Sequence, residues 1–301
     1  MRIADSMIAG TVVTQMQKSS TRLFELQQQV ASGLAFTRPS ENPAGAVRAA
    51  FLLSGIAELE RFRANCNEAE AGMRMTEIAL GEMADSLREA QSAALAMTPF
   101  DDAGNAALAD QVHEIAKRIA AGANSTYEGR YLFAGYEVRT KPVVENAAGP
   151  PPYTYAGDRG DIVVQLSRAI KLVTNFDAAE VLNLDGAVDA GRDDVLETLR
   201  KVEEALRAGD SEAIQTGLTD MDWHYGRVVT LRGQTGTGMQ QVEMAKNRSE
   251  DGKLTLQTLL SEVQDVDISE AIIGLRSQEV AYQAAAAAAS SLHRASLLDY
   301  F

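Results

Sequence analysis

The sequence has little of what catalytic and metal-binding proteins use. Its 301 residues include one cysteine, Cys66, and three histidines, His113, His224 and His293. A single cysteine excludes an intramolecular disulfide and a cysteine-based metal cluster. The histidines fall on different predicted helices without the spacing of a zinc-binding helix, and no histidine is placed to activate the thiol. We therefore predict that the chain is not an enzyme and binds no metal or cofactor.

Other absences restrict the partners and the location. Aromatic residues make up only 6% of the chain, and the net charge of −14 would repel nucleic acid and anionic membranes. No run of about 18 apolar residues occurs, so we expect no membrane-spanning helix. The apolar run after Arg2 is broken by Asp5 and Ser6, unlike a secretory signal. We expect a protein that stays in the cytoplasm or leaves it without a cleaved signal.

The C-terminal 35 residues are the most informative stretch. Asp267 followed by Glu270 is typical of a helix N-cap, and no glycine or proline follows Gly274. Apolar residues at spacings of three and four predict a seam for a partner helix: Ile268, Ile272, Leu275, Tyr282, Ala286 and Ala289. Residues 284–289 are all alanine, which favours a helix but buries little surface. The apolar tip, Leu297, Leu298, Tyr300 and Phe301, indicates a surface that a partner covers.

The first helix is predicted over residues 6–35. Its seam contains Val13, Met16, Leu23, Val30 and Leu34, with Leu26 on the flank. Polar residues interrupt this seam, so two interpretations remain equally open. It is either a solvated amphipathic helix or the partner of the C-terminal helix.

A turn and a long helix follow. Asn42 is a good N-cap and Pro43 suits the first helical position, so the next helix should begin at Pro43. Apolar residues continue at three- and four-residue spacing to Met97, which predicts a rod of about 80 Å and an elongated molecule. Residues 211–264 predict a second rod, antiparallel to the first and bent or thinned by glycines between Gly226 and Gly238.

Between the rods we predict shorter elements. Asp101 and Asp102 start a helix that continues to about residue 122, and residues 195–206 form another that Gly209 ends. Residues 128–135 are β-prone, and residues 141–191 are predicted to form turns and short strands.

The glycine-rich residues 233–238, inside the second rod, lack the Lys-Ser/Thr of a phosphate loop. Small residues where helices approach closely explain them better.

Four stretches carry a family resemblance. They are residues 1–3 with 26–33 (Leu-Gln-Gln-Gln-Val-Ala-Ser-Gly), residues 38–43 (Arg-Pro-Ser-Glu-Asn-Pro), residues 129–135 (Gly-Arg-Tyr-Leu-Phe-Ala-Gly) and residues 247–301. Together they resemble the bacterial flagellar hook-associated proteins of the flagellin superfamily. The closest resemblance is to the family of the third hook-associated protein, which joins hook and filament. The turn at 38–43 and the closing Leu-Asp-Tyr-Phe differ from the corresponding flagellin sequences.

The resemblance implies a mainly α, elongated antiparallel helical bundle or coiled coil, with paired terminal helices and a small β-rich insert. Residues 1–42 and 265–301 would form a terminal helical domain (D0-like). Residues 43–140 and 192–264 would form the long-helix rod with a β-hairpin (D1-like). Residues 141–191 would form an outer insert (D2-like).

The resemblance also implies partners and a route. The partners are the first hook-associated protein on the hook side, flagellin on the filament side, further copies in a ring, and a flagellar export chaperone. Export through the flagellar type III apparatus, without a cleaved signal, would place the protein outside the cell at the hook–filament junction.

The assembly interface is expected on the terminal helices, beside a turn motif. Its candidate residues are Val13, Met16, Leu23, Leu26, Val30, Ile268, Ile272, Leu275, Tyr282, Ala286, Leu297, Leu298 and Phe301. The turn motif contains Arg38, Pro39, Ser40, Asn42 and Pro43. Two alternatives stay open: a flagellin-type filament subunit, and a secreted adhesin or enzyme that acts through the insert.

Overall fold

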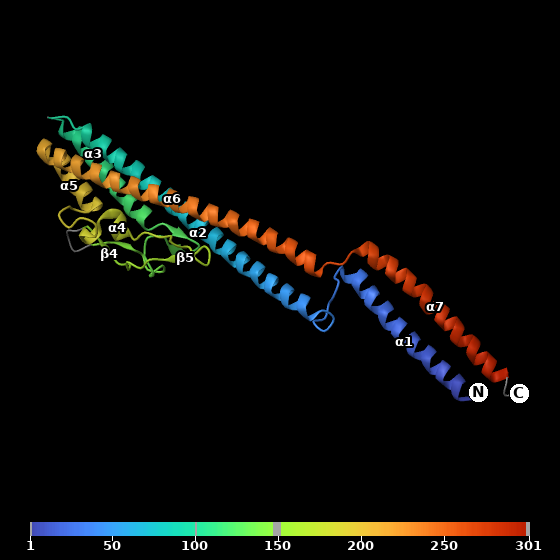
Figure 1. Cartoon of the computed structure of the whole chain (residues 1–301). Coiled ribbons are helices and arrows are strands. Elements are labelled where there is room, and N and C mark those ends of the chain that lie inside the picture. Colours follow the sequence, from blue (N-terminus) through green and yellow to red (C-terminus); the bar gives the residue numbers. More distant parts are fainter. Residues whose placement is uncertain (1, 100, 147–151, 299–301) are drawn as a thin grey trace. The chain divides into compact units, whose positions relative to one another are not determined.

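The computed structural model describes residues 2–99, 101–146 and 152–298, with the side chains of residues 2–6, 8, 9 and 289–298 outside the description. The fold is mainly α, as predicted (Figure 1). Its helices are α1 (Arg2–Ser32), α2 (Pro43–Leu95), α3 (Asp102–Ala123), α4 (Ala178–Leu182), α5 (Val195–Ala208), α6 (Ser211–Gln264) and α7 (Ile268–Leu298). Short strands lie between α3 and α4, and a 3-10 turn, η1 (Leu184–Gly186), follows α4.

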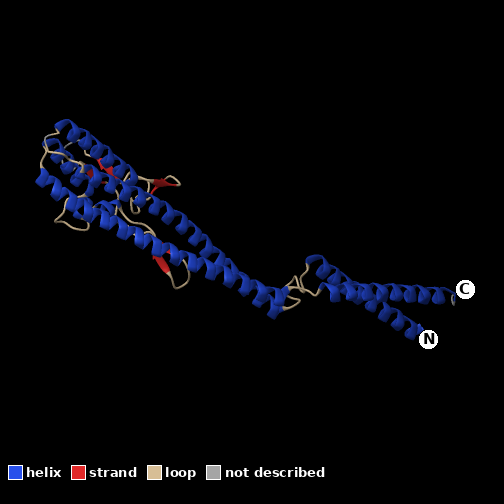
Figure 2. Cartoon of the chain, turned by 90° about the horizontal axis from the view of Figure 1, so that it is seen from above, coloured by secondary structure: helices blue, strands red, loops and turns tan. Residues whose placement is uncertain are grey.

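The chain forms two compact units. The terminal unit contains Met1–Glu58 and Gly252–Phe301, and the central unit contains Leu59–Asp251. In the terminal unit, α1 and α7 lie side by side in both views (Figures 1 and 2). The structure therefore supports the pairing interpretation of the first helix over the solvated one.

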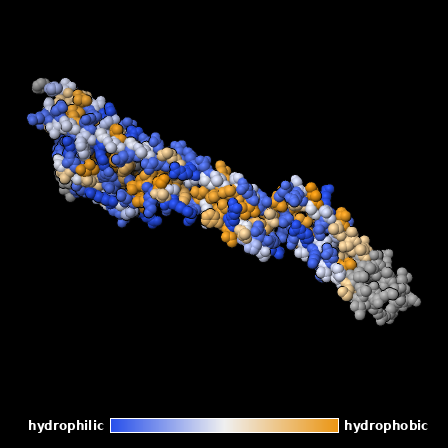
Figure 3. Space-filling view, in the orientation of Figure 1, coloured by the Kyte–Doolittle hydropathy of each residue, from blue (hydrophilic) through white to orange (hydrophobic). Residues whose placement is uncertain are grey.

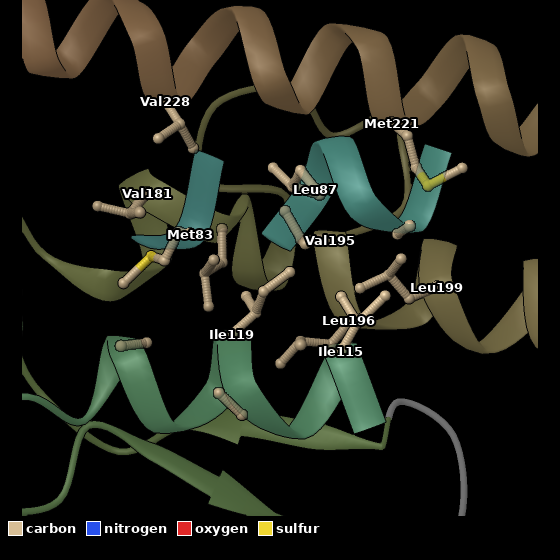
Figure 4. Packing of buried hydrophobic residues seen from close by; sticks show 14 of the residues in the cluster. Met83, Leu87, Ile115, Ile119, Val181, Val195, Leu196, Leu199, Met221 and Val228 are labelled. Atoms are coloured by element: carbon tan, nitrogen blue, oxygen red, sulfur yellow. The ribbon is translucent and has the colours of Figure 1, made fainter. Parts of the chain in front are cut away.

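In the central unit, α2 and α6 run antiparallel, as predicted. Three ion pairs connect them: Arg63 with Glu250, Glu70 with Lys246, and Glu77 with Arg232. Helix α3 packs along α5, and their apolar faces meet those of α2 and α6 in one core (Figure 4). Residues such as Met83, Leu87, Ile119 and Leu199 are almost fully buried there.

Local capping explains where the shorter helices begin and end. The Asp101 carboxylate accepts a hydrogen bond from the Gly104 N–H, and α3 begins at the next residue. Asp194 accepts from the N–H groups of Leu196 and Glu197 at the start of α5. Gly209 ends α5 with a left-handed φ of +64°. Each of these ends was readable from the sequence because its cause is local.

The strands form three separate antiparallel pairs in the described residues. The first pair is a hairpin, β1 (Thr126–Tyr127) with β2 (Arg130–Tyr131), whose turn places Glu128 and Gly129 at positive φ. The second joins β3 (Val143–Glu145) to β4 (Tyr153–Tyr155), and the third joins β5 (Val163–Gln165) to β6 (Lys171–Val173). The predicted β-rich segment is thus built from short hairpins.

One part of this segment differs from the prediction. Residues 178–182 form the short helix α4, where we expected only turns and strands. The Asp177 carboxylate caps α4, and Ala178, Val181 and Leu182 are buried in the same core as Met83 and Leu87. Burial on one face selects this single turn of helix, which is too short to show a helical period in the sequence.

The second rod is one continuous helix through its glycines. Helix α6 spans residues 211–264 without interruption. A Cβ added at Gly238 would overlap Cε, the flexible end of Met73 on α2, so Gly238 lies where α6 packs closely against α2. Gly233 and Gly236 instead face open space. The prediction of small residues at a close approach therefore holds for Gly238 but not for all six residues of 233–238.

Candidate functional site

The terminal helix pair, defined here as α1 and α7, is closed at one end by backbone hydrogen bonds. Leu34 and Asp265 form an antiparallel bridge. The Ala35 N–H donates to the Gln264 carbonyl at 2.7 Å, and the Val266 N–H donates to the Gly33 carbonyl at 3.0 Å. The chain segments that leave α1 and enter α7 are therefore held together by main-chain contacts that do not depend on side-chain identity.

The turn motif beside this closure is ordered by its own polar groups. Gly33, at φ +73°, ends α1, and the Gln29 amide donates to the Ala35 carbonyl at 2.7 Å. The Glu41 carboxylate accepts from the backbone N–H groups of Thr37 and Arg38, which lowers the pKa of Glu41.

The start of α2 follows from the same motif. The Asn42 side chain accepts from the Gly45 N–H at 2.9 Å, and α2 begins at Pro43 as predicted. Beneath the turn, Phe36 is buried. The motif residues themselves are all exposed: Arg38, Pro39, Ser40, Asn42 and Pro43.

The predicted interface residues divide into four groups. Leu26 is buried. Met16, Leu23, Val30, Leu275, Tyr282 and Ala286 are half-buried. Val13, Ile268 and Ile272 are exposed. The side chains of Leu297 and Leu298, and all of Phe301, lie outside the described residues. The first two groups fit a seam between α1 and α7, whereas the third presents apolar surface to solvent.

Sequence reasoning missed further exposed apolar residues on this pair. Phe24 is 59% exposed, Ile273 is 70% exposed and Val280 is 67% exposed. They lie off the three-and-four seam, so the periodicity that found the seam passed over them. Figure 3 shows apolar side chains among the polar ones over this part of the surface. Several large apolar residues outside a helix seam are the signal that would have found this second face.

Two histidines of the central unit, His113 and His224, interact with neighbouring side chains of the fold. His113 Nδ1 lies 3.0 Å from a Glu203 carboxylate oxygen on the surface. His224 of α6 is buried beside Thr198 of α5, and burial lowers the pKa of His224 to about 4. Among the described residues, no group of His, Cys, Asp and Glu side chains is arranged to hold a metal ion. In the same part of the chain, no helix combines the length and apolarity needed to cross a membrane.

Comparisons with known proteins agree with this architecture. A family model described as the bacterial flagellin N-terminal helical region matches residues 3–138. Flagellar hook-associated protein 3 of Salmonella typhimurium is 23% identical, over 94% of each chain. The protein of the same name from Escherichia coli is 22% identical, over 99% of each chain.

Solved structures have the same fold at low identity. A putative flagellar hook-associated protein from Vibrio parahaemolyticus superimposes with a TM-score of 0.68 at 16% identity, covering 75% of this chain and all of that one. Flagellar hook-associated protein 3 from Legionella pneumophila gives a TM-score of 0.63 at 14% identity, covering 71% and 98%. FlgL from Bacillus cereus gives 0.59 at 21% identity, covering 70% and 99%.

Proposed function

We propose that this chain, which belongs to the flagellin superfamily, is the adaptor that joins hook and filament in the bacterial flagellum. The observation that carries the proposal is the end-to-end match with two hook-associated proteins 3, which spans 94% or more of both chains in each case. A match of that extent includes the terminal helices, the rods and the central insert together. It favours a whole-protein role over one that resides in a single segment.

The exposed apolar face of the terminal helix pair supports an assembly role. Phe24, Ile273 and Val280 would each bury apolar surface against a neighbour, worth about 1.5–3 kcal/mol for a fully buried side chain. Ile273 and Val280 are seven residues apart on α7, so they lie on the same face of that helix, and exposed apolar residues sharing a face support an interaction surface. We infer that this face contacts further copies of the chain in a ring.

The specific partners belong to the same proposal. They are the first hook-associated protein on the hook side, flagellin on the filament side, and an export chaperone before assembly. We also propose export by the flagellar type III route. Residues 1–42 with 265–301 serve as the inner helical domain, residues 43–140 with 192–264 as the rod, and residues 141–191 as the outer insert.

The location is tested by immunogold imaging of intact flagella with an antibody raised against this protein. We expect a single band of label between hook and filament. Label along the whole filament would instead indicate a filament subunit, and flagella without label would contradict the proposal. A strain that lacks the gene is the control for antibody specificity.

A role for the insert in adhesion is tested separately. Deleting the insert would be uninformative, because Val181, Leu182 and Leu184 belong to the core of the central unit. The β5–β6 hairpin offers a milder change, because Val163 and Val173 are 52% and 44% exposed. We expect Val163→Ser with Val173→Ser to leave motility intact. Lost surface attachment with normal motility would favour the adhesin.

A further inference from the structure

Three elements of the central unit surround a cavity of about 120 Å³. Residues of α2 line it, together with residues of the β1–β2 hairpin and of the β5–β6 hairpin. The Asn65 amide of α2 donates to the Gln165 carbonyl of β5 at 2.9 Å, which holds the second hairpin beside this helix (Figure 1). The cavity belongs to the central unit alone, so it is separate from the terminal helix pair.

Gly72 leaves the cavity open on the α2 side. Outside its own turns of helix, no atom lies within 4 Å of where a Cβ of Gly72 would stand, although this residue is half-buried. Apart from proline, glycine is the residue that a helix interior favours least, and a larger residue here would extend into the open space. The space beside Gly72 is therefore room for a group that the chain itself does not supply.

Three polar side chains of the lining already have partners within the chain. The Thr76 hydroxyl donates to the Gly72 carbonyl at 3.1 Å. The Thr174 hydroxyl donates to the Ile162 carbonyl at 3.2 Å. The Asn175 side chain both donates to and accepts from the backbone. Because a ligand needs no polar atoms to satisfy these groups, the cavity suits an uncharged, apolar molecule.

Four other side chains of the lining favour an aromatic ring. Met73 offers a thioether, which makes favourable contacts with the edges of aromatic rings. Tyr127 and Tyr131 offer rings that stack or meet edge to face. The Arg130 guanidinium is attracted to a ring face, and its ion pair with Glu68 at 3.1 Å holds it beside the cavity.

The volume fits a single ring. In another protein, an engineered apolar cavity of about 150 Å³ binds benzene. We propose that this cavity of the central unit is a binding site for a small, uncharged aromatic molecule of about the size of benzene. The site is independent of the proposed function, because it lies within one chain and needs no partner copy.

The test uses benzene as the probe and NMR of ¹³C-methyl methionine in the full chain as the measurement. Met73 lines the cavity, so the ring current of bound benzene should shift its methyl signal, which Met73→Leu assigns. Met221 belongs to a different buried cluster and is the internal reference. We expect the Met73 signal to saturate with a dissociation constant of about 1 mM or lower, and the Met221 signal to stay in place.

A second probe distinguishes an aromatic site from one that is merely apolar. Cyclohexane has a similar size but no π-system, so it lacks the attraction to the tyrosine rings and the guanidinium. We expect it to compete with benzene about fivefold more weakly than unlabelled benzene does.

Filling the cavity should remove the binding. Gly72→Leu places a side chain in the open space and should weaken benzene binding at least about tenfold. Gly226→Leu is the matched control and should leave binding unchanged. Gly226 is also a helical glycine with open space around its Cβ position, but it lies on α6 outside the cavity. Circular dichroism establishes that each variant is folded.

The absence of a saturating Met73 shift in the unaltered chain would overturn the proposal, whether or not the variants fold. Equal competition by cyclohexane would overturn the aromatic class of the ligand. Binding that survives in folded Gly72→Leu would overturn the placement in this cavity. None of these results depends on where imaging locates the protein, so the proposed function and the cavity site fail or stand separately.

Discussion

Arg232 on α6 donates two hydrogen bonds to the same carboxylate oxygen of Glu77 on α2, from Nη2 at 2.6 Å and from Nε at 3.1 Å. Lys246 with Glu70 and Arg63 with Glu250 continue this series of ion pairs along the same two helices. Opposite charges at matched heights favour one alignment of two long helices, because a shift would bring like charges together. These charges favour one alignment of α2 and α6 in the central unit, whereas backbone hydrogen bonds close the terminal pair at one end.

The Arg232–Glu77 pair should contribute modestly to stability. Arg232 is 38% exposed and Glu77 is 33% exposed at the side chain, so solvent screening limits the gain. We expect Arg232→Ala to lower the free energy of unfolding by about 0.5–1 kcal/mol. Arg74→Ala is the control, because its partner Glu70 lies on the same helix and Arg74 is 66% exposed. Urea unfolding that ranks Arg74→Ala as the more damaging change would contradict the assignment.

Phe133 should be among the most sensitive positions of the central unit. Its side chain is fully buried in the core, and its carbonyl accepts a hydrogen bond from the Ala178 N–H at 2.8 Å. Phe133→Ala should cost about 3–5 kcal/mol through lost burial and the cavity left behind. Leu95→Ala, at a residue 71% exposed, should change stability by less than about 0.5 kcal/mol. Thermal unfolding followed by circular dichroism measures both.

Substitutions of Leu26 and Phe24, both on α1, should distinguish an effect on stability from an effect on assembly. Leu26 is buried, so Leu26→Ala should destabilise the terminal pair by about 2 kcal/mol and speed its proteolysis in the free chain. Phe24 is 59% exposed, so Phe24→Ala should leave proteolysis of the free chain unchanged and reduce incorporation into flagella. Equal incorporation of Phe24→Ala and the unaltered chain would remove Phe24 from the proposed interface.

His224 should make the central unit sensitive to acid. Burial is the main cause that lowers the pKa of His224 to about 4. Interaction with the Asp193 backbone and the charge of Asp193 oppose this shift, and the Arg192 guanidinium adds to it. The His224 Nε2 atom lies 3.5 Å from Thr198 Oγ1. Because the folded pKa lies below the unfolded value of about 6.5, this contribution is complete above that pH. It is lost as the pH falls toward 4, by up to about 3 kcal/mol.

The single tryptophan provides a local measurement of this effect. Trp223 lies edge-on to His224, with ring centroids 5.0 Å apart, so its fluorescence should report protonation of the imidazole. We expect His224→Phe to remove the acid-dependent part of the unfolding free energy between pH 6.5 and 4. His113→Phe, at a surface histidine, is the control and should keep the wild-type profile. Identical profiles for His224→Phe and wild type would exclude His224 as the cause.

Asp194 should act in the opposite direction over an overlapping range. Burial raises its pKa to about 6, although the N–H groups of Glu197 and Leu196 partly offset this by stabilising the carboxylate. A folded pKa above the unfolded value means that stability is lost as the pH rises from about 4 through 6. Asp194→Asn keeps an N-cap and should flatten this loss in denaturant titrations at successive pH values. An unchanged slope would show that the carboxyl does not titrate there.

The amino-acid sequence determined several helix ends, because their causes lie within a few residues, whereas α1 spans Arg2–Ser32 and not the predicted 6–35. Asn42 with Pro43, Asp101 and Gly209 each fix one boundary through a cap or a left-handed residue. The sequence also predicted the long α2 and α6 and their antiparallel pairing, since uninterrupted three-and-four spacing leaves little alternative. The periodicity also placed Met16, Leu23 and Leu275 on the predicted seams, whereas Leu26, which is buried, was predicted only on the flank.

Only the tertiary structure decided which faces are covered. Three residues of the predicted seam remain exposed: Val13, Ile268 and Ile272. The exposed apolar residues Phe24, Ile273 and Val280 were not predicted from helical periodicity. Helix α4 exists because Ala178, Val181 and Leu182 are buried against residues distant in the chain. The contact of Ser19 with Gln278 joins positions 259 residues apart. Helical periodicity is a local property, whereas burial depends on what packs against each face, and that is settled only when the whole chain has folded.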